Sequence, residues 1–321
     1  MDGFLLTFHS ERNPLVVSLR EAGMEVVCID DFRIARNRLD GCVAYYGNVF
    51  TEIKHPLAFI SLLKALHRRA IPYVFWNRDA PWNVGIKKHR EWLLHLLKPV
   101  DIYLTHSLQM AHLFSRNPAI YFPNAAQRAY CAEGDLADLR IPSHYRYDVT
   151  FIGAVGNLKR HNCRERAAFL RAVQAGLQAR SSNARFRIVD TVHENLSVEE
   201  QLALIRTSKV NLNFGAMCDL PGNPSWGLPE RVFGIPATGG FLLTDWRQAI
   251  PTTFPDDSCD FFHDAEECVG KILYYLPRFD LLRARAEKLH TQVLAGHTYA
   301  IRARQLVELL HRNSYAHRPA A

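Results

Sequence analysis

LPERVFGIPATGGFLLTD, residues 228–245, predicts a helix, a glycine turn and a strand in direct succession. Gly239 and Gly240 stand where the helix gives way to the strand, and a turn there requires the positive φ angles that glycine adopts without steric cost. The run FLLTD that follows is short and mostly apolar, as expected for a buried strand. A helix that returns directly into a buried strand is the building unit of an α/β fold.

The same alternation of strand-like and helix-like segments continues along the whole chain. Further strand-like runs lie at 3–8, 24–30, 42–46, 71–76, 102–106, 120–123, 148–154, 185–190 and 210–214. This pattern indicates mostly parallel sheets covered by helices on both faces. A polar, irregular stretch at 131–147 separates two series of similar size.

Two successive series predict two Rossmann-like, doubly wound domains that face each other. We place an N-terminal domain at 1–145, a C-terminal domain at 146–298, and a last helix with a frayed tail at 299–321. Doubly wound folds bind ligands beyond the carboxyl ends of their strands. The cleft between the domains is therefore the expected site.

The composition is that of an ordinary globular protein. The chain has 321 residues, of which 48% are hydrophobic and 22% charged, and this excludes disorder or a coiled coil as its main character. Its net charge of +7 fits an anionic ligand, and it fits solubility alone equally well. No nucleic-acid motif is present, so we expect no nucleic-acid partner.

The cysteines and the hydropathy of the chain indicate the cellular compartment of the protein. The seven cysteines are scattered and form no CxxC pair, which predicts neither a zinc site nor a redox dithiol. The first residues lack the basic stretch of a signal peptide, and no apolar run reaches the length of a membrane span. We expect a cytoplasmic protein, with peripheral association at the inner membrane face as the alternative.

One loop has the chemistry of an anion site. Residues 151–160, FIGAVGNLKR, join a strand to a helix through glycines and two cations. Glycines allow backbone N–H groups to approach a phosphate, and Lys159 and Arg160 supply counter-charge. The sequence is neither GxGxxG nor a Walker A loop, so a tight turn with two solvated cations is the competing interpretation.

The stretch RVFGIPATGGFLLTD resembles the R-x-F-E-x-x-A-x-G-G-x-x-L-T-D segment of glycosyltransferases related to the spore-maturation protein CgeB. Residues 295–310, AGHTYAIRARQLVELL, are similar to that family's H-T-Y-x-x-R ending. The segments YDVTFIG (147–153) and VFWNRDAPW (74–82) also match its patterns. The resemblance covers roughly residues 71–310.

The resemblance implies a GT-B fold with a C-terminal helix that crosses back to the N-terminal domain. It also implies a nucleotide-sugar donor held mainly by the C-terminal domain and no essential metal or other cofactor. Carried onto this sequence, it assigns the donor to Gly153, Lys159, Arg160, Arg231, Thr238, Gly239 and Gly240. Trp226, in the neighbouring loop, is a further candidate to stack on the donor.

One position departs from the family pattern. Gly234 stands where the family usually has the Glu that would bind the donor ribose. Glu230 lies one helical turn earlier and on the same helix face, so it is a candidate substitute. An unusual donor or weak donor binding are the alternatives.

Candidates for a catalytic base come from the N-terminal series. His9 follows the first strand and Asp79 follows the strand at 71–76, and both would lie at the carboxyl edge of the sheet. His106 is a weaker candidate. His297 and Tyr299 are expected to pack the last helix. A retaining reaction would need no such base, because the leaving phosphate can accept the proton.

The sequence thus predicts a metal-independent glycosyltransferase that moves a sugar from a nucleotide-sugar to an acceptor hydroxyl. A surface polysaccharide, a lipid-linked saccharide or a protein would supply that hydroxyl. Two other functions fit the same architecture. One is a nucleotide-sugar-binding protein with a decayed catalytic site, which Gly234 would favour, and the other is a nucleotide-sugar epimerase of the same fold.

Overall fold

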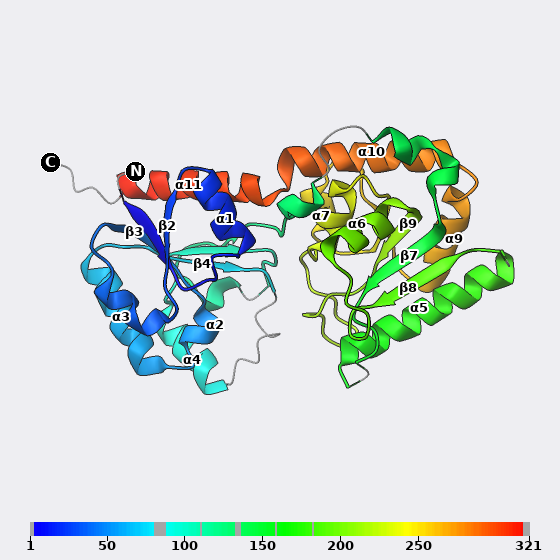
Figure 1. Cartoon of the computed structure of the whole chain (residues 1–321). Helices are drawn as coiled ribbons and strands as arrows, with labels where there is room; N and C mark the ends of the chain where they lie inside the picture. The colour runs from blue at the N-terminus through cyan, green and yellow to red at the C-terminus, as the bar shows by residue number, and fades with distance from the viewer. Residues whose placement is uncertain are drawn as a thin grey trace. The chain divides into compact units, whose positions relative to one another are not determined.

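The computed structural model describes residues 3–79, 88–109, 111–131, 136–157, 159–181 and 183–316. The chain divides into two compact units, one formed by Met1–Pro123 with Tyr299–Ala321 and the other by Asn124–Thr298. Each unit contains one parallel sheet with flanking helices (Figure 1). The α/β class with two Rossmann-like domains, predicted from the alternation, is confirmed.

The first unit has a six-stranded parallel sheet in the order β2-β1-β3-β4-β5-β6. The strands are β1 (Phe4–Thr7), β2 (Glu25–Cys28), β3 (Cys42–Tyr46), β4 (Tyr73–Asn77), β5 (Ile102–Thr105) and β6 (Ile120–Tyr121). The helices are α1 (Pro14–Glu21), α2 (Val49–Glu52), α3 (Pro56–Arg68), α4 (Lys88–Leu97) and α11 (Tyr299–Ala316). The last helix, red in Figure 1, packs along α1, so the chain returns to this unit at its end.

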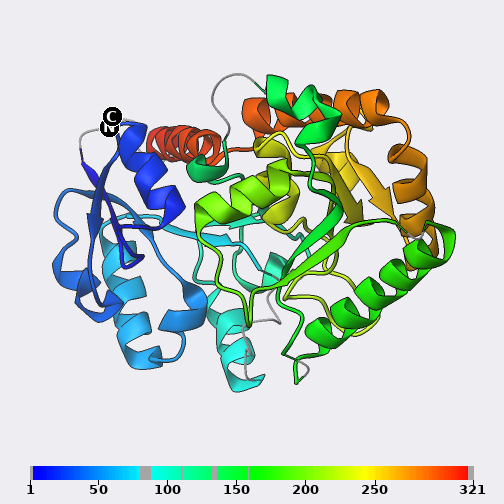
Figure 2. The same cartoon turned by 45° about the vertical axis from the view of Figure 1, so that its right-hand side comes forward.

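The second unit has a five-stranded parallel sheet in the order β11-β10-β9-β7-β8. The strands are β7 (Tyr147–Gly153), β8 (Phe186–Asp190), β9 (Ser208–Asn213), β10 (Leu242–Asp245) and β11 (Asp260–Phe262). The helices are α5 (His161–Arg180), α6 (Val198–Arg206), α7 (Arg231–Ala237), α8 (Ile250–Thr253), α9 (Ala265–Tyr275) and α10 (Phe279–Gly296). Figure 2 shows α5 and α6 on opposite sides of this sheet.

The strand order reverses once in each sheet. The first sheet grows outward in both directions from β1 and β3, and the second from β7 and β9. The carboxyl ends of these strand pairs are the places where doubly wound folds bind ligands. A ligand is therefore expected at these strand ends in each unit.

Local signals in the sequence account for the helix ends of the second unit. Ser197 caps α6: its side chain accepts from the Glu200 N–H, while the Glu200 carboxylate accepts from the Ser197 N–H, and the two bonds form the capping box that the sequence Ser-Val-Glu-Glu favours. Gly239, just after α7, has a φ of +83°, as expected for the turn into β10.

The division between the units lies at 123/124 and not at the predicted 145/146. The described residues between 124 and 145 form short 3₁₀ turns at Arg128–Tyr130, Ala137–Arg140 and Pro142–His144, and they are anchored in the second unit. The Ala126 N–H donates to the His297 carbonyl at 2.8 Å, and Asn124 donates to the Leu228 carbonyl at 3.0 Å. Contacts so distant in sequence leave no trace in local composition. The second boundary, at 298/299, coincides with the expected one.

Candidate functional site

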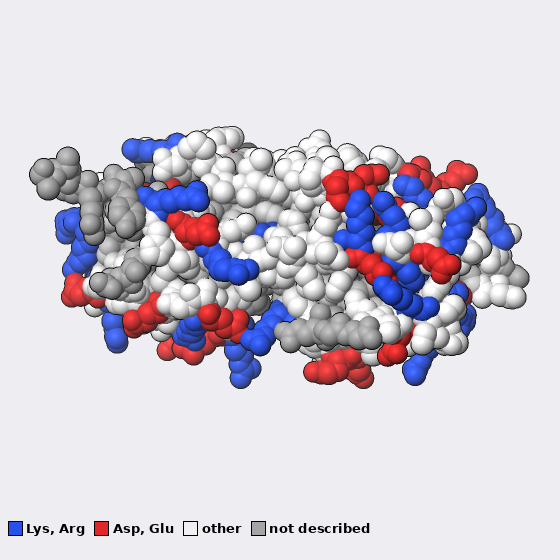
Figure 3. All heavy atoms as spheres, turned by 90° about the horizontal axis from the view of Figure 1, so that it is seen from above, with Lys and Arg blue, Asp and Glu red and all other residues white. Residues whose placement is uncertain are grey.

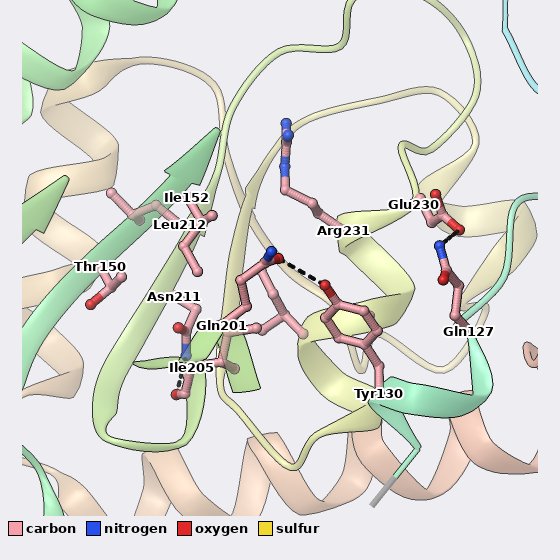
Figure 4. Close-up of a pocket in the computed structure, with 12 residues that line it drawn as sticks. Gln127, Tyr130, Thr150, Ile152, Gln201, Ile205, Asn211, Leu212, Glu230 and Arg231 are labelled. Atoms are coloured by element: carbon pink, nitrogen blue, oxygen red, sulfur yellow. Dashed lines mark hydrogen bonds between the residues drawn. The ribbon is translucent and has the colours of Figure 1, made fainter. Parts of the chain in front are cut away.

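A pocket of about 130 Å³ lies in the second unit, along the two strands at which the strand order reverses (Figure 4). Its floor comes from β7 and β9, and its sides come from α6 and α7. The lining residues are Gln127, Tyr130, Thr150, Ile152, Gln201, Ile205, Asn211, Leu212, Glu230, Arg231, Gly234 and Ile235. The sequence-predicted Glu230 and Arg231 are among them.

Two hydrogen bonds tie the segment after Pro123 to the helices of the pocket. The Tyr130 hydroxyl donates to Gln201 Oε1 at 2.8 Å, and Gln127 Nε2 donates to Glu230 Oε1 at 3.0 Å (Figure 4). The Glu230 carboxylate is therefore engaged with an amide from this segment. Glu230 directly precedes α7, one helical turn before Gly234, which is where a substitute for the family's Glu is expected to lie.

Asn211 lies at the floor of the pocket and is only 2% exposed. Its Nδ2 donates to the carbonyls of Ile205 at 3.2 Å and Phe241 at 3.3 Å. Its Oδ1 is buried and accepts no hydrogen bond from the part of the chain that the structure describes. Buried polar atoms are normally paired, so this acceptor calls for an explanation.

Arg231 is held in place on two sides of its guanidinium group. Its Nε donates to Asn213 Oδ1 at 2.9 Å, and its Nη2 donates to the Gly215 carbonyl at 3.1 Å. Its Nη1 makes no hydrogen bond with the described residues and lies beside Gly153, where an added Cβ would be only 3.3 Å away, and its guanidinium carbon is 5.8 Å from the centre of the Phe151 ring. Burial, together with the nearby charge of Arg166, lowers the pKa of Arg231 to about 9, so it is charged at neutral pH.

Two further arginines lie close to Arg231 at the carboxyl edge of the sheet. Arg166 is 1% exposed and donates to the carbonyls of Ala154 at 2.7 Å, Phe214 at 3.0 Å and Gly215 at 3.3 Å. Arg247 is also 1% exposed, and it bridges Asp219 at 2.7 Å and Asp245 at 2.8 Å.

These three guanidinium groups face two carboxylates. Burial acts to lower the pKa of Arg247, but Asp245 and Asp219 raise it overall. Arg247 in turn holds the pKa of Asp219 below its usual value, against the opposing effect of burial. Arg166 and Arg231 have no carboxylate in hydrogen-bond contact among the described residues. The cluster therefore keeps an excess of positive charge, which favours an anion.

In the loop predicted to bind an anion, a carboxylate of the protein already accepts hydrogen bonds from the backbone N–H groups. Asp190, at the end of β8, accepts from the Val155 N–H at 2.9 Å and also from the Gly156 N–H. These bonds lower the pKa of Asp190 although burial acts to raise it. A carboxylate of the protein thus takes the N–H groups that a phosphate would use. Lys159 and Arg160 are exposed, and their contact with a donor stays a prediction.

The remaining donor candidates lie apart from the pocket lining. Thr238, Gly239 and Gly240 stand between α7 and β10, and an added Cβ would lie 2.8 Å from Leu139 at Gly239 and 2.7 Å from Ile205 at Gly240. Close packing explains both glycines. Trp226 is half-buried, and its carbonyl accepts from the Ala249 N–H. Donor contacts at these positions stay predictions.

In the first unit, His9 lies at the reversal point of the sheet, directly after β1. Its ring centroid is 4.4 Å from that of Tyr46, at the end of β3, and its Nε2 is buried without a hydrogen-bond partner in the described chain. Burial lowers the pKa of His9 to about 4, in part opposed by a hydrogen bond with the Gly47 backbone. Such a histidine is neutral at pH 7 but is a weak base.

The other predicted residues of this unit are spread over its carboxyl edge. Asp79 is exposed after β4, which β3 separates from β1, and its N–H donates to Asn77 Oδ1 at 3.1 Å. His106 follows β5 and is 1% exposed. Tyr299 is buried, and its hydroxyl accepts from Arg78 at 2.6 Å, so it packs the last helix as expected. Residues 80–82 of the family-like segment lie outside the described residues.

Several residues of the site were not identified from the sequence. Arg166 lies on the apolar stripe of α5, between Cys163 and Ala167, and a charge on such a stripe is a usable signal. Tyr130 and Asn211 carry no such signal, because one lies in an irregular segment and the other inside a strand.

Within the described ranges, no group of three or more His, Cys, Asp or Glu side chains could hold a metal ion. No helix in the described part of the chain is long and apolar enough to cross a membrane.

Comparison with known proteins gives a family match over part of the chain and a shared fold over nearly all of it. A family model described as glycosyl transferase-like matches residues 160–308. A search of curated proteins found no match. Sucrose-phosphate synthase from Thermosynechococcus elongatus has a similar structure, with a TM-score of 0.62 at 12% identity, over 98% of this chain and 99% of that one.

Two more solved structures share the fold. HepE of Anabaena in complex with UDP-glucose has a TM-score of 0.60 at 8% identity, over 97% of this chain and 100% of that one. A glycosyltransferase from Rickettsia africae has a TM-score of 0.56 at 11% identity, over 96% and 89% of the two chains. The chain thus has the two-domain α/β fold of GT-B glycosyltransferases.

Proposed function

We propose that this protein is a GT-B glycosyltransferase that uses a nucleotide-sugar donor. The observation that carries the proposal is Arg231, whose guanidinium is fixed by Asn213 and Gly215 while Nη1, beside an apolar pocket, makes no hydrogen bond with the described residues. A diphosphate at Nη1 would place its nucleoside in the pocket. The family model over residues 160–308 and a shared fold with HepE, solved with UDP-glucose, support this proposal.

Transfer of a sugar from a nucleotide diphosphate requires positive charge where the leaving group forms. The acceptor oxygen forms a bond to the anomeric carbon of the sugar, and the bond from that carbon to the diphosphate oxygen breaks. Negative charge develops on the diphosphate, and Arg231 would stabilise it together with Arg166, since neither of the two has a carboxylate in hydrogen-bond contact among the described residues. The acceptor proton passes to a base, for which His9 and Asp79 are the candidates, or to the leaving diphosphate if the reaction is retaining.

The finer features of the proposal rest on the resemblance to CgeB-related glycosyltransferases. The acceptor is a polysaccharide, lipid-linked saccharide or protein hydroxyl, and catalysis needs no metal or other cofactor because arginines supply the counter-charge. We place the protein in the cytoplasm. Peripheral association with the inner membrane face is the alternative; on the face shown in Figure 3, Lys and Arg are interspersed with Asp and Glu.

The first test is nucleotide binding by calorimetry, with UDP, dTDP, CDP, GDP and ADP. At least one should bind to the wild type, and Arg231→Ala should weaken that binding by about 10- to 100-fold, as expected for a lost charge-assisted hydrogen bond. Arg171→Ala, an exposed arginine on α5, is the matched control and should change nothing. Equal affinity in Arg231→Ala and wild type would remove the diphosphate assignment.

Two additional experiments test the loop before α5 and distinguish an enzyme from a binding protein. Lys159→Ala and Arg160→Ala decide whether the loop before α5 belongs to the donor site, since unchanged affinity in both would exclude it. Turnover of the matching nucleotide-sugar over an acceptor panel separates an enzyme from a binding protein. The second candidate, a binding protein with a decayed site, is favoured by Gly234 and by the low pKa of His9. It predicts binding without turnover.

A further inference from the structure

The carboxylate of Asp245 is connected to Arg231 by hydrogen bonds along two separate routes. Asp245 ends β10 and Asn213 ends β9, and these strands are neighbours in the sheet. On the first route, Asn213 Nδ2 donates to Asp245 Oδ1 at 3.1 Å, and Asn213 Oδ1 accepts from Arg231 Nε at 2.9 Å. The side-chain amide of Asn213 therefore links the carboxylate to one edge of the guanidinium group.

The second route runs through the backbone of Gly215. Its N–H donates to Asp245 Oδ2 at 3.2 Å, and its carbonyl accepts from Arg231 Nη2 at 3.1 Å. The φ of Gly215 is +68°, a backbone conformation that glycine adopts without steric cost. The two routes start at one carboxylate and fix Nε and Nη2 of Arg231, which extends from the start of α7 (Figure 4).

Only a carboxylate at position 245 can serve both routes. Oδ1 accepts from the Asn213 amide, whereas Oδ2 accepts from the Gly215 N–H and from Arg247 Nη2 at 2.8 Å. Both oxygens of Asp245 thus face hydrogen-bond donors. An amide at this position would turn its own NH₂ group towards one of these donors and would lose that route.

Both routes pass through uncharged groups, and this leaves the charge of Arg231 available to a ligand. Asn213 is 0% exposed, so water does not compete for its amide. An amide that donates to a carboxylate is polarised and becomes a stronger acceptor at its oxygen, without adding a charge. Arg231 is therefore held in one orientation with no carboxylate in hydrogen-bond contact among the described residues.

We propose that Asp245 and Asn213 are positioning residues of the donor site, which hold the guanidinium group of Arg231 so that Nη1 faces the diphosphate. The inference rests on the proposed function, since it takes Arg231 as the contact to the diphosphate. Arg231 and Asp245 are the first and last residues of RVFGIPATGGFLLTD, and the two routes give both ends of this stretch one shared role.

The first test is a set of double-variant comparisons by calorimetry, with whichever of UDP, dTDP, CDP, GDP and ADP binds the wild type most tightly. Asp245→Asn and Asn213→Leu should each bind this nucleotide at least about tenfold more weakly, because the guanidinium group is no longer fixed. In an Arg231→Ala background the same substitutions should change the affinity less than about twofold, since they act through Arg231. Equal losses in both backgrounds would overturn the inference.

Ser208→Ala is the matched control for loss of a buried hydrogen bond. Ser208 is 1% exposed at the opposite end of β9 from Asn213, and its hydroxyl donates to the Leu204 carbonyl at 2.6 Å. This variant should bind the nucleotide as the wild type does. A loss as large as that in Asn213→Leu would show a general effect of destabilising the sheet and would contradict a positioning role.

A second measurement needs only the wild type to fold normally. In a chain labelled with ¹⁵N-arginine, Nη1 and Nη2 of a guanidinium group held at Nε and Nη2 give separate NMR resonances, whereas rotation about the Nε–Cζ bond merges them. The Arg231 signals, assigned by their loss in Arg231→Ala, should be separate in the wild type. Merged signals would overturn the inference even if Asp245→Asn and Asn213→Leu do not fold.

These outcomes distinguish the inference from the proposed function. If Arg231→Ala weakens nucleotide binding but Asp245→Asn and Asn213→Leu do not, the inference fails and the function stands. If no nucleotide binds to the wild type, both fail.

Discussion

The ring of Tyr130 rests on the backbone of Gly234: a Cβ added at Gly234 would lie 3.6 Å from Tyr130 Cδ1, an ordinary van der Waals contact. The Tyr130 hydroxyl is anchored on Gln201, so the ring is held over α7. At the position where the CgeB-like pattern has a Glu, this chain therefore presents an aromatic ring to the pocket. Any contact with a donor ribose must come from another group.

Replacing Gly234 by Ala should stabilise the protein. Gly234 lies inside α7, its φ is not positive, and a Cβ meets nothing closer than 3.6 Å. Glycine in a helix costs about 0.5–1 kcal/mol relative to alanine, so the free energy of unfolding should rise by that amount. Urea unfolding measures it. Gly239→Ala is the control and should destabilise, because Gly239 has a φ of +83° and Leu139 lies 2.8 Å from the added Cβ.

Arg247→Met should destabilise the second unit severely. The substitution leaves the carboxylates of Asp219 and Asp245 without their bridging cation. Breaking a buried ion pair from one side costs about 3–5 kcal/mol. Urea unfolding should show a loss of this order, whereas Arg187→Met, in a half-exposed pair with Glu194, should cost under about 1 kcal/mol. Similar losses in the two variants would contradict the role given to Arg247.

The titration of His9 should be visible in both spectra and stability. Its pKa in the folded protein is lowered to about 4 from the usual 6.5, so the unfolded chain binds more protons between these values. Stability from the neutral ring is therefore complete above about pH 6.5 and is lost as the pH falls towards 4, by at most about 3 kcal/mol. His9→Gln should remove this part of the pH dependence.

Proton NMR of the ring carbons checks the same point directly. The His9 resonance, assigned by its loss in His9→Gln, should titrate with a midpoint near 4. A midpoint at 6 or higher would show that the ring is hydrated, and it would restore His9 as a base of ordinary strength.

The fold could be predicted because its signals are local. Strand-helix alternation, the capping box at Ser197 and the glycine turn at Gly239 each depend on residues close in sequence. The unit boundary could not be predicted, because residues 124–145 join the second unit through contacts with residues about a hundred or more positions away, such as Gln127 with Glu230.

The site was only partly predictable for a related reason. Arg231 and Glu230 stand in a recognisable pattern, and both line the pocket. Asp190 pairs with the N–H groups of Val155 and Gly156 because β7 and β8 are neighbours in the sheet. No local sequence pattern encodes that strand pairing. Asn211 becomes notable only through the pairing of its two amide atoms, which the sequence does not show.

The last helix should loosen when Arg302 is replaced by Met. Arg302 is 2% exposed, and its Nε donates to the Pro123 carbonyl at 2.9 Å while its guanidinium lies over the Phe122 ring. Its loss leaves a buried carbonyl unpaired, at a cost of about 1–3 kcal/mol. Hydrogen exchange of the α11 amides should accelerate correspondingly, by about 5- to 150-fold if local opening sets the rate.

Arg304→Met supplies the matched control for this experiment, since Arg304 lies on the same helix with its side chain exposed. Its α11 amides should exchange as in the wild type. The H-T-Y-x-x-R ending would then hold the helix that returns to the first unit, through Tyr299 and Arg302, with no part in the reaction. Unchanged exchange in Arg302→Met, together with a loss of turnover, would instead assign Arg302 to the chemistry.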